Sequence, residues 1–392
     1  MNIVVVNWQD WTHPFAGGAE VHLREVFTRI AGSGHGVTLL CSAYPGAPRE
    51  EVRDGIRIIR KGGRHSFNAV APRLLRDTVR SRRFDVVVED MNKIPFFLPL
   101  LTRLPVVVQI HHLFGTSVFR EINAAAATYV WGMERAAVKL LRRRSVPIMV
   151  GSNSTRDELL AHGCRPEDVD VIHYGFDLGT FTPGGIKHPS PMIGYLGRLK
   201  RYKSVDHLLE AVPAVLRTFP DLTVKIVGDG DDRPRLESLS ARLGLGGVVE
   251  FTGFVPERTK VDILRRMWLG VMPSVKEGWG LTVLEANACG TPVIASRVPG
   301  LKEAVLDGET GLLYPYGDRG ALSQAIVRML TDAGLRARLS SAALKRASLF
   351  TWERAATETL SLLDRRLDEA RRRSGRPSAP PTPGAASSAA AF

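Results

Sequence analysis

The sequence is poor in cysteine and contains no long hydrophobic run. Only 3 cysteines occur in 392 residues, and Cys41, Cys164 and Cys289 are far apart in the chain. This argues against a disulfide framework or a cysteine-based zinc site and is typical of a reducing compartment. No stretch approaches the roughly 20 apolar residues that cross a bilayer. The most apolar segment, residues 94–110, is interrupted by prolines and an arginine.

Two missing motifs argue against whole classes of function. The first apolar strand, NIVVVN, is not followed by G-x-G-x-x-G, so a dinucleotide-dependent dehydrogenase is disfavoured. No aromatic and basic platform for nucleic acid is present, although the formal net charge is +13. That charge instead favours phosphorylated small molecules or an acidic membrane surface. The first residues lack the pattern of a signal peptide, so we expect a cytoplasmic protein.

Short β-branched runs alternate with amphipathic helical stretches in both halves of the chain. Their continuous apolar character predicts parallel sheets covered on both faces. A Gly- and Pro-rich segment, 176–191, separates the two sets. The sequence therefore predicts an α/β protein with two Rossmann-like, doubly wound domains that face each other across a cleft, 1–180 and 181–351. The final residues, 371–392, have too few apolar side chains for a core and are expected to be disordered. The predicted strands are 2–7, 36–42, 56–60, 85–90, 105–111, 147–153, 192–197, 222–230, 248–254, 268–274 and 291–296.

Glycine and positive charge follow two strands of the second half. Arg198 and Lys203 come after the strand GYLG and before a helix that is expected to begin near Ser204. Two cations beside a helix start suit a phosphate group, although solvated loop cations are about as common. After the next strand, Gly228 permits a close backbone approach, and a plain turn is the simpler interpretation there.

The loop KEGWG precedes a predicted helix over 281–288. The main-chain amides of Gly280, Leu281 and Thr282 lie at that helix start and are free to bind a diphosphate. Glu277 lies in the loop and Glu285 about one turn into the helix. Carboxylates accept hydrogen bonds from sugar hydroxyls, so we predict that the two acids hold different groups on either side of one diphosphate. The alternative is that both acids are ordinary surface residues.

These residues resemble a known family. Glu277 and Glu285, with seven residues between them, resemble the E-x7-E signature of retaining GT-B glycosyltransferases, and of glycosyltransferase family 4 in particular. EGWGLTVLEANACGTPVIAS is similar to E-G-F-G-L…E-A-x-A-x-G-x-P-V-I-A, with Trp279 where Phe is usual. VIHYGFDLGTFTP resembles V-I-P-N-G-V-D-x-x-x-F-x-P, and GRLKRYKSVDHLLEA resembles G-R-L-x-x-x-K-G-x-x-x-L-I-x-A, with Ser204 for Gly. Similar stretches run from GGAEVHLREV to FTWERA, which leads into a terminal helix at about 352–370 that joins the first domain.

The resemblance implies a GT-B fold and retaining transfer of a hexosyl group from a UDP- or GDP-linked sugar to a saccharide, lipid-linked or small-molecule acceptor. It implies that Glu277 holds the donor sugar, Glu285 the ribose, and His111 faces the transferred sugar, with His112 as the rival. Trp279 is expected to reshape the sugar pocket. The predicted catalytic residues are His111, Glu277, Arg198 and Lys203. The predicted donor contacts are Gly17, Gly18, Arg198, Lys203, Gly228, Glu277, Gly280, Leu281, Thr282 and Glu285.

No Asp-x-Asp motif stands where it would serve the diphosphate, so we predict neither a metal ion nor another cofactor. The acceptor is expected on the first domain, where Asn92, Lys93 and His112 are the predicted contacts. Glu89 and Asp90 lie beside them in the sequence and are further candidates for acceptor hydroxyls. The basic stretches 57–84 and 133–146 suggest contact with an anionic membrane, with solvated helix faces as the alternative. The rival function is a nucleotide-sugar-binding protein without transferase activity.

Overall fold

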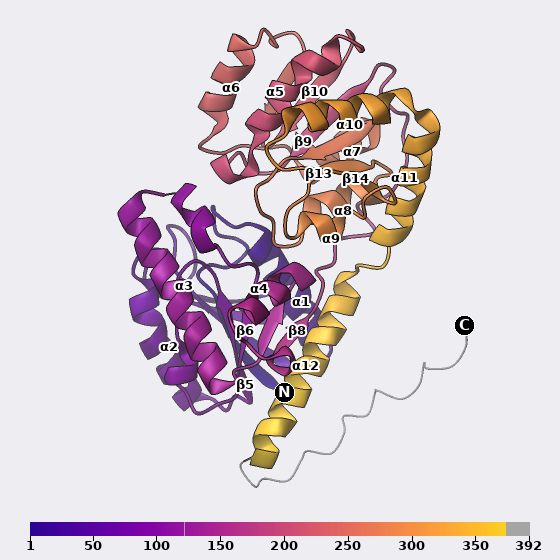
Figure 1. Ribbon diagram of the computed structural model, residues 1–392. Coiled ribbons are helices and arrows are strands. Elements are labelled where there is room, and N and C mark those ends of the chain that lie inside the picture. The colour runs from indigo at the N-terminus through magenta and orange to yellow at the C-terminus, as the bar shows by residue number, and fades with distance from the viewer. Residues whose placement is uncertain (121, 374–392) are drawn as a thin grey trace, which may run out of the picture.

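The computed structural model describes residues 1–120 and 122–373 and forms two lobes, each built on its own sheet (Figure 1). The first sheet has the strand order β3-β4-β2-β1-β5-β6-β7-β8. Only β3 runs antiparallel among the described pairings, against β4. The strands are β1 (Asn2–Val6), β2 (Gly36–Cys41), β3 (Glu50–Arg53), β4 (Ile56–Arg60), β5 (Val86–Met91), β6 (Val106–Ile110), β7 (Ile148–Val150) and β8 (Val169–Val171).

Helices cover both faces of this first sheet because its strands are apolar on both sides. On β1, Ile3 and Val5 pack with α1 (Gly18–Gly32) and α12 (Trp352–Arg373). Val4 and Val6 point the other way, as alternation along a strand requires, and join the core beneath the remaining helices. Those helices are α2 (Phe67–Ser81), α3 (Ala124–Arg144) and α4 (Asn153–Ala161), and the short helices are η1 (Leu98–Leu100), η2 (Gly115–Arg120) and η3 (Pro166–Asp168).

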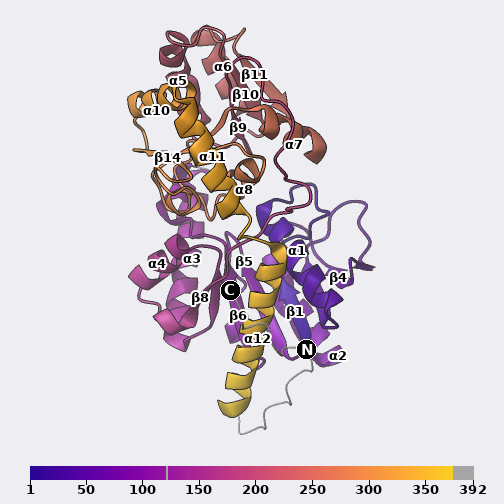
Figure 2. The ribbon, with the colours of Figure 1, turned by 90° about the vertical axis from the view of Figure 1, so that its right-hand side faces the viewer.

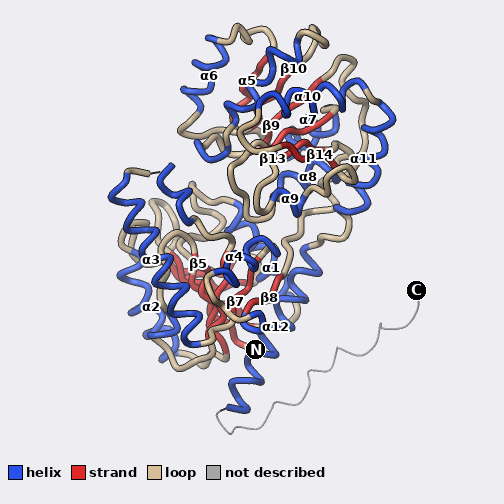
Figure 3. Tube along the Cα trace, viewed as in Figure 1, coloured by secondary structure: helices blue, strands red, loops and turns tan. Residues whose placement is uncertain are grey.

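The second sheet has the order β11-β10-β9-β12-β13-β14, and all its described pairings are parallel. This confirms the predicted α/β fold with two parallel, doubly wound sheets, whose strands alternate with helices in Figure 3. The strands are β9 (Met192–Leu196), β10 (Thr223–Val227), β11 (Val249–Gly253), β12 (Leu269–Met272), β13 (Val293–Ser296) and β14 (Gly311–Tyr314). The helices are η4 (Arg201–Lys203), α5 (Val205–Leu216), α6 (Arg233–Arg242), α7 (Glu257–Arg266), α8 (Leu281–Ala288), α9 (Leu301–Ala304), α10 (Arg319–Thr331) and α11 (Ala333–Ala347).

The last helix returns the chain to the first lobe. α12 packs along α1, where Arg29 bonds Glu353 at 2.9 Å, and Figure 2 shows it lying beside the first sheet. The helix is longer than predicted and includes residues 371–373, which were expected to begin the disordered tail. An ion pair one turn apart, Arg371 with Asp368, supports this last turn. The rest of the predicted tail, 374–392, lies outside the described residues. Within the described part of the chain, no helix is both long and apolar enough to cross a membrane.

Candidate functional site

The two lobes meet where the carboxyl ends of their central strands face each other. A Cβ atom on Gly278, in the loop after β12, would lie 2.8 Å from the main-chain oxygen of His111, at the end of β6. A Cβ on Gly17 would overlap the guanidinium of Arg198, with 1.5 Å to Nη2. Glycine at both positions therefore permits the lobes to close. The structure brings together predicted residues that lie far apart in the sequence.

Charged side chains tie the two lobes together beside this contact. The Nζ atom of Lys276 lies 2.9 and 2.8 Å from the two carboxylate oxygens of Glu158, on α4. Glu303, on α9, accepts from the main-chain amides of Asn153 at 2.9 Å and Ser154 at 3.0 Å. Its carboxylate thereby caps the positive end of α4. These polar contacts accompany an apolar core that includes residues of both lobes.

Lys203 and Glu277 form a buried ion pair in the cleft. The Lys203 Nζ atom lies 2.6 and 2.8 Å from the Glu277 oxygens, and the side chains are only 13% and 12% exposed. The hydroxyl of Ser274 also donates to Glu277, at 2.6 Å. Burial disfavours the charged ammonium, but the carboxylate outweighs it and raises the pKa of Lys203 well above its usual range. Neither predicted donor residue is free in this conformation.

Arg198 differs from the paired Lys203. It is exposed, and within the described residues its guanidinium has neither an ion pair nor a side-chain hydrogen bond. The start of α8 offers further donors, because the amides of Leu281 and Thr282 have no acceptor among the described residues. Gly280 caps that helix with φ 83°, a left-handed conformation that favours glycine. A free cation and free helix-start amides together suit an anionic group such as a diphosphate.

Glu285 faces inward from α8. One of its oxygens lies 2.8 Å from the Nζ atom of Lys260, on α7. The other oxygen is buried and has no hydrogen-bond partner within the described chain. Burial raises the pKa of Glu285, although Lys260 opposes the shift. An unsatisfied buried carboxylate oxygen is costly, and a ligand hydroxyl that donates to it would recover that cost.

Gly228 has a packing role of its own. A Cβ at this position would lie 2.0 Å from the main-chain oxygen of Gly197, so glycine lets the ends of β9 and β10 touch. The structure therefore accounts for this glycine without a ligand. Its contact with a donor stays a prediction.

Both ring nitrogens of His111 are engaged within the protein. Nε2 lies 2.8 Å from Asp90 Oδ1, and Nδ1 lies 2.6 Å from the hydroxyl oxygen of Tyr174. Burial lowers the pKa of His111, but the carboxylates of Asp90 and Glu20 outweigh burial and raise it overall. A sugar hydroxyl must therefore displace one of two existing partners to bond this ring.

His112 differs from its neighbour. It is half-buried and packs against Phe114, with ring centroids 4.4 Å apart. Burial, together with nearby cations that include Lys276, Lys203 and Lys93, lowers the pKa of His112 to about 3. The imidazole is therefore neutral at physiological pH in a positively charged part of the cleft.

The other predicted acceptor residues have structural partners. Asn92 donates to the side chain of Asn7 at 2.8 Å, and the ammonium of Lys93 lies 5.1 Å from the ring centroid of Phe114. Glu89 is buried, and its two oxygens accept three main-chain bonds from residues 96–98. These bonds make Glu89 a residue that holds the 96–98 turn, and Asp90 is a partner of His111.

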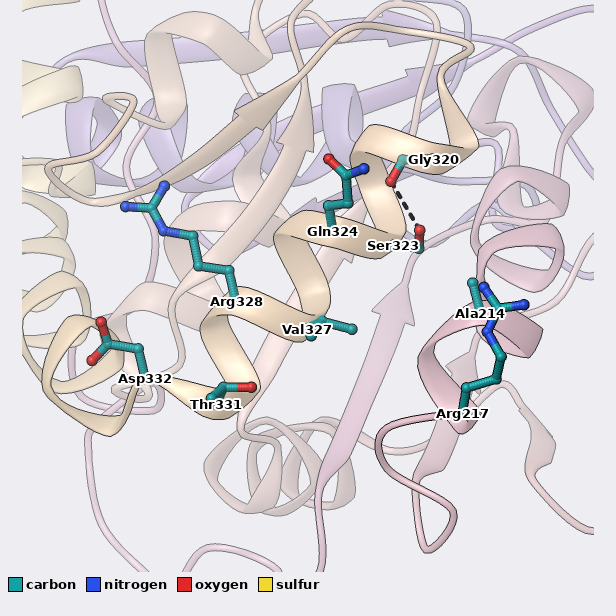
Figure 4. Close-up of a pocket in the computed structure, with 9 residues that line it drawn as sticks. All are labelled: Ala214, Arg217, Gly320, Ser323, Gln324, Val327, Arg328, Thr331 and Asp332. Atoms are coloured by element: carbon teal, nitrogen blue, oxygen red, sulfur yellow. Dashed lines mark hydrogen bonds between the residues drawn. The ribbon is translucent and has the colours of Figure 1, made fainter.

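A cavity of about 460 Å³ lies between the lobes, beside Phe114. Its lining includes Thr116 and Ser117 from the first lobe and Lys276 and Lys302 from the second. A second hollow, of about 700 Å³, lies between α5 and α10 and is shown in Figure 4. Neither lining contains a predicted site residue, but Val275 and Lys276 of the inter-lobe cavity directly precede Glu277 in the sequence. We therefore place the candidate site in the inter-lobe cleft.

The sequence reasoning missed several residues of the cleft. Tyr174, Lys260 and Ser274 were not singled out, although each bonds a predicted residue. Trp279 is 2% exposed and packs against His173, so it is not itself a wall of the cleft, and its effect on the sugar pocket stays a prediction. The departures from the family pattern at positions 173, 174 and 279 were the available signal. Within the described residues, no group of three or more His, Cys, Asp or Glu side chains is placed to hold a metal ion.

The fold and the cleft define the class of GT-B glycosyltransferases, and comparison with known proteins gives the family. The family profile described as glycosyl transferases group 1 matches residues 180–346. The profile described as glycosyltransferase family 4 matches residues 16–180. The chain therefore belongs to this family of glycosyltransferases, as its motifs suggested.

Curated relatives and solved structures agree with this assignment. The D-inositol 3-phosphate glycosyltransferase of Kribbella flavida is 33% identical over 233 residues, which cover 55% of this chain and 55% of that protein. The protein of the same name from Streptomyces bingchenggensis is 36% identical over 232 residues, which cover 54% and 51%. The chain thus spans about half the length of the curated relatives it matches.

Among solved structures, sucrose-phosphate synthase from Thermosynechococcus elongatus superposes with a TM-score of 0.79 at 24% identity, covering 93% of this chain and 98% of that one. HepE from Anabaena in complex with UDP-glucose superposes with a TM-score of 0.74 at 21% identity, covering 92% and 100%. At these identities the likeness shows the shared fold.

Proposed function

We propose that the protein is a retaining, metal-independent glycosyltransferase that moves a hexosyl group from a UDP- or GDP-linked sugar to a saccharide, lipid-linked or small-molecule acceptor. One observation carries the proposal. Among the described residues, the guanidinium of Arg198 and the amides at the start of α8 have no partner, and they accompany two inward-facing acids, Glu277 and Glu285. This is a set of donors for a diphosphate between two acceptors for hydroxyl groups.

The leaving diphosphate is the group that most needs stabilisation in such a transfer. Arg198 and the amides of Leu281 and Thr282 supply positive charge and fixed N–H dipoles where negative charge develops. When a hydroxyl group of the donor sugar hydrogen-bonds to the carboxylate of Glu277, Lys203 leaves its ion pair and supplies a second positive charge to the diphosphate. The buried free oxygen of Glu285 accepts from a ribose hydroxyl. These residues perform the electrostatic work for which a metal ion is the common alternative.

The acceptor is proposed to enter the inter-lobe cavity beside Phe114 and His112. Neutral His112 offers both a donor and an acceptor nitrogen to hydroxyl groups. Lys276 and Lys302 line the same cavity and favour an acceptor that carries a phosphate. The relatives named for D-inositol 3-phosphate make a phosphorylated polyol the first acceptor to test.

A nucleotide-sugar screen tests the donor proposal. We expect one UDP- or GDP-sugar to raise the melting temperature, since a ligand at about 100 times its Kd stabilises the fold by about 2.7 kcal/mol. Arg198→Ala should abolish this increase without lowering the melting temperature of the free protein. Arg217→Ala, which removes an exposed arginine of the outer hollow, is the matched control and should respond like the wild type.

The same screen separates the proposal from its rival. Stabilisation by a nucleotide sugar, with no product from any saccharide, polyol phosphate or lipid-linked acceptor, would support a binding protein without transferase activity. If no nucleotide sugar changes the melting temperature at saturating concentration, the donor proposal fails. Retention is tested by the anomeric configuration of the product, and metal independence by full activity in EDTA.

We also propose peripheral contact with an anionic membrane through the face covered by α2 and α3. Arg73, Arg76 and Arg80 are exposed on α2, and the basic residues 142–144 are exposed at the end of α3. Leu100, beside the end of α3, is 52% exposed. Each basic residue near such a surface contributes about 1 kcal/mol. Cosedimentation with vesicles that contain phosphatidylserine, compared with neutral vesicles, tests this, and equal recovery with both would reject it.

A further inference from the structure

Three departures from the family pattern touch one another beside the donor loop, residues 275–280. Trp279 stands where the pattern has Phe, and His173 and Tyr174 stand where it has Pro and Asn. The indole of Trp279 stacks on the imidazole of His173, with centroids 4.3 Å and planes 16° apart. Its Nε1–H group also donates to the main-chain oxygen of Tyr174 at 3.2 Å. Trp279, His173 and Tyr174 therefore form one unit of contacting residues.

The two larger aromatic rings of this unit are buried. Trp279 is 2% exposed, and Phe350 packs against its edge with centroids 5.0 Å apart. The ring of Tyr174 fills the space beside Gly151, where an added Cβ would lie 2.5 Å from the tyrosine Cζ. Neither aromatic side chain is placed to touch a ligand. Any effect that these two side chains have on the cleft is therefore indirect and depends on the neighbouring residues that they position.

The hydroxyl of Tyr174 connects the unit to His111. Gln109 donates its side-chain N–H to the tyrosine oxygen at 3.1 Å, so that oxygen already accepts a hydrogen bond. The hydroxyl proton is then available to His111 Nδ1, 2.6 Å away. On the other side of the ring, Nε2 faces the carboxylate of Asp90 at 2.8 Å, which can only accept when ionised. Both partners fit a neutral ring that carries its proton on Nε2.

We propose that Trp279, His173 and Tyr174 are positioning residues that link the seating of the donor loop to His111 and hold its imidazole in the Nε2–H tautomer. The same loop carries Glu277, so a correctly seated loop places the donor acid and fixes His111 together. The consequence for catalysis rests on the proposed function, whereas the effect on His111 does not.

The groups around His111 act in opposite directions on its protonation. Asp90 on β5 and Glu20 on α1 favour the imidazolium form of His111. His22 on α1, whose ring centroid lies 5.5 Å from that of His111, disfavours it. The Tyr174 hydroxyl favours the neutral ring, because it donates to Nδ1. Removing that hydroxyl therefore raises the pKa of His111. A hydrogen bond of this kind corresponds to a shift of about half to one pH unit.

The experiment uses the free full-length protein with ¹⁵N-labelled histidine and follows the ring nitrogens by NMR across pH. In the wild type we expect neutral His111 to be protonated on Nε2. Tyr174→Phe should raise the pKa of His111 by about half to one pH unit. Trp279→Phe should shift it in the same direction by less, and should add no further shift in the Tyr174→Phe background.

A matched control distinguishes positioning from general loss of packing. Trp268 also donates its indole N–H to a histidine carbonyl, that of His188 at 2.8 Å, but it lies away from His111. Trp268→Phe should lower the melting temperature and leave the His111 titration unchanged. If Trp268→Phe and Trp279→Phe shift the pKa of His111 equally, the proposal is overturned. Wild-type neutral His111 protonated on Nδ1, a result that needs no variant to fold, would also overturn it.

Turnover gives a second, separate readout. If a nucleotide sugar is used, Tyr174→Phe should move the acidic limb of the kcat profile to higher pH by the shift seen in NMR, with the donor KM unchanged. Trp279→Phe should also raise the donor KM several-fold, because the loop carries Glu277. An unmoved kcat profile would overturn the catalytic consequence. Absence of turnover with every nucleotide sugar would instead refute the proposed function and leave the NMR result standing.

Discussion

Replacing one member of the Lys203–Glu277 pair should destabilise the protein far more than replacing both. In Lys203→Met, the carboxylate of Glu277 stays in a site where it is 12% exposed, with the hydroxyl of Ser274 as its remaining partner. In Glu277→Gln, the ammonium of Lys203 is left instead. The double variant Lys203→Met/Glu277→Gln removes both charges and leaves side chains of similar volume.

The magnitude follows from the geometry of the pair. At the observed 2.6–2.8 Å, two unit charges attract by about 6 kcal/mol at an effective dielectric constant of 20. Desolvation of both groups offsets most of this energy, so the intact pair contributes little net stability. Breaking a buried pair costs about 3–5 kcal/mol, because the remaining charge is uncompensated. We therefore expect each single variant to lose about 3–5 kcal/mol, and the double variant about 0–2 kcal/mol.

Urea unfolding and scanning calorimetry of the four proteins measure this cycle. At about 2–4 °C per kcal/mol, the single variants should melt roughly 6–20 °C lower than the wild type. The double variant should recover most of that loss yet remain inactive, which separates the function of the pair from folding. Single losses below about 1 kcal/mol, or a double variant as unstable as the sum of the singles, would refute the reasoning.

Three further predictions address other contacts of the cleft. Gly17→Ala should weaken donor binding about tenfold with little change in stability, because the new methyl group displaces Arg198. Gly32→Ala, where an added Cβ meets nothing within 4 Å, is the control and should bind the donor normally in calorimetry. Glu285→Gln should weaken UDP or GDP binding by about 1–3 kcal/mol, the cost of one unsatisfied buried group, and unchanged affinity would contradict its role. The pKa of His111 is higher in the folded protein than its ordinary value of 6.5. Protonated His111 therefore stabilises the fold fully below pH 6.5, and this stabilisation is lost as the pH rises through the folded-state pKa. In urea unfolding across pH 5–9, the free energy of unfolding of Asp90→Asn should therefore fall less steeply with rising pH than that of the wild type. Identical slopes for the two proteins would contradict this.

The local pattern of the sequence determined most of the architecture. Runs such as NIVVVN and MIGYLG are apolar on both faces, and the structure has parallel strands there. The helix predicted over 281–288 has those bounds, because Gly280 precedes it and Gly290, with φ 73°, follows it. Three strands were missed. β8 has only 3 residues, and β3, with the sequence EEVR, is a polar edge strand that pairs through the Asp54–Gly55 turn. β14, GLLY, is a short apolar run without a clear period.

The sequence by itself therefore determined that the chain has two α/β lobes and which loops carry donor-type residues. Spacing along the chain also placed Glu277 and Glu285 on either side of a helix start. The partners of these residues were decided only by the tertiary structure. Lys203 meets Glu277, Lys260 meets Glu285, and Trp279 bonds the carbonyl of Tyr174, 105 residues away in the sequence. The reason is physical: periodicity reports which face of an element is buried, whereas pairing across the cleft depends on how two separately folded sheets close on each other.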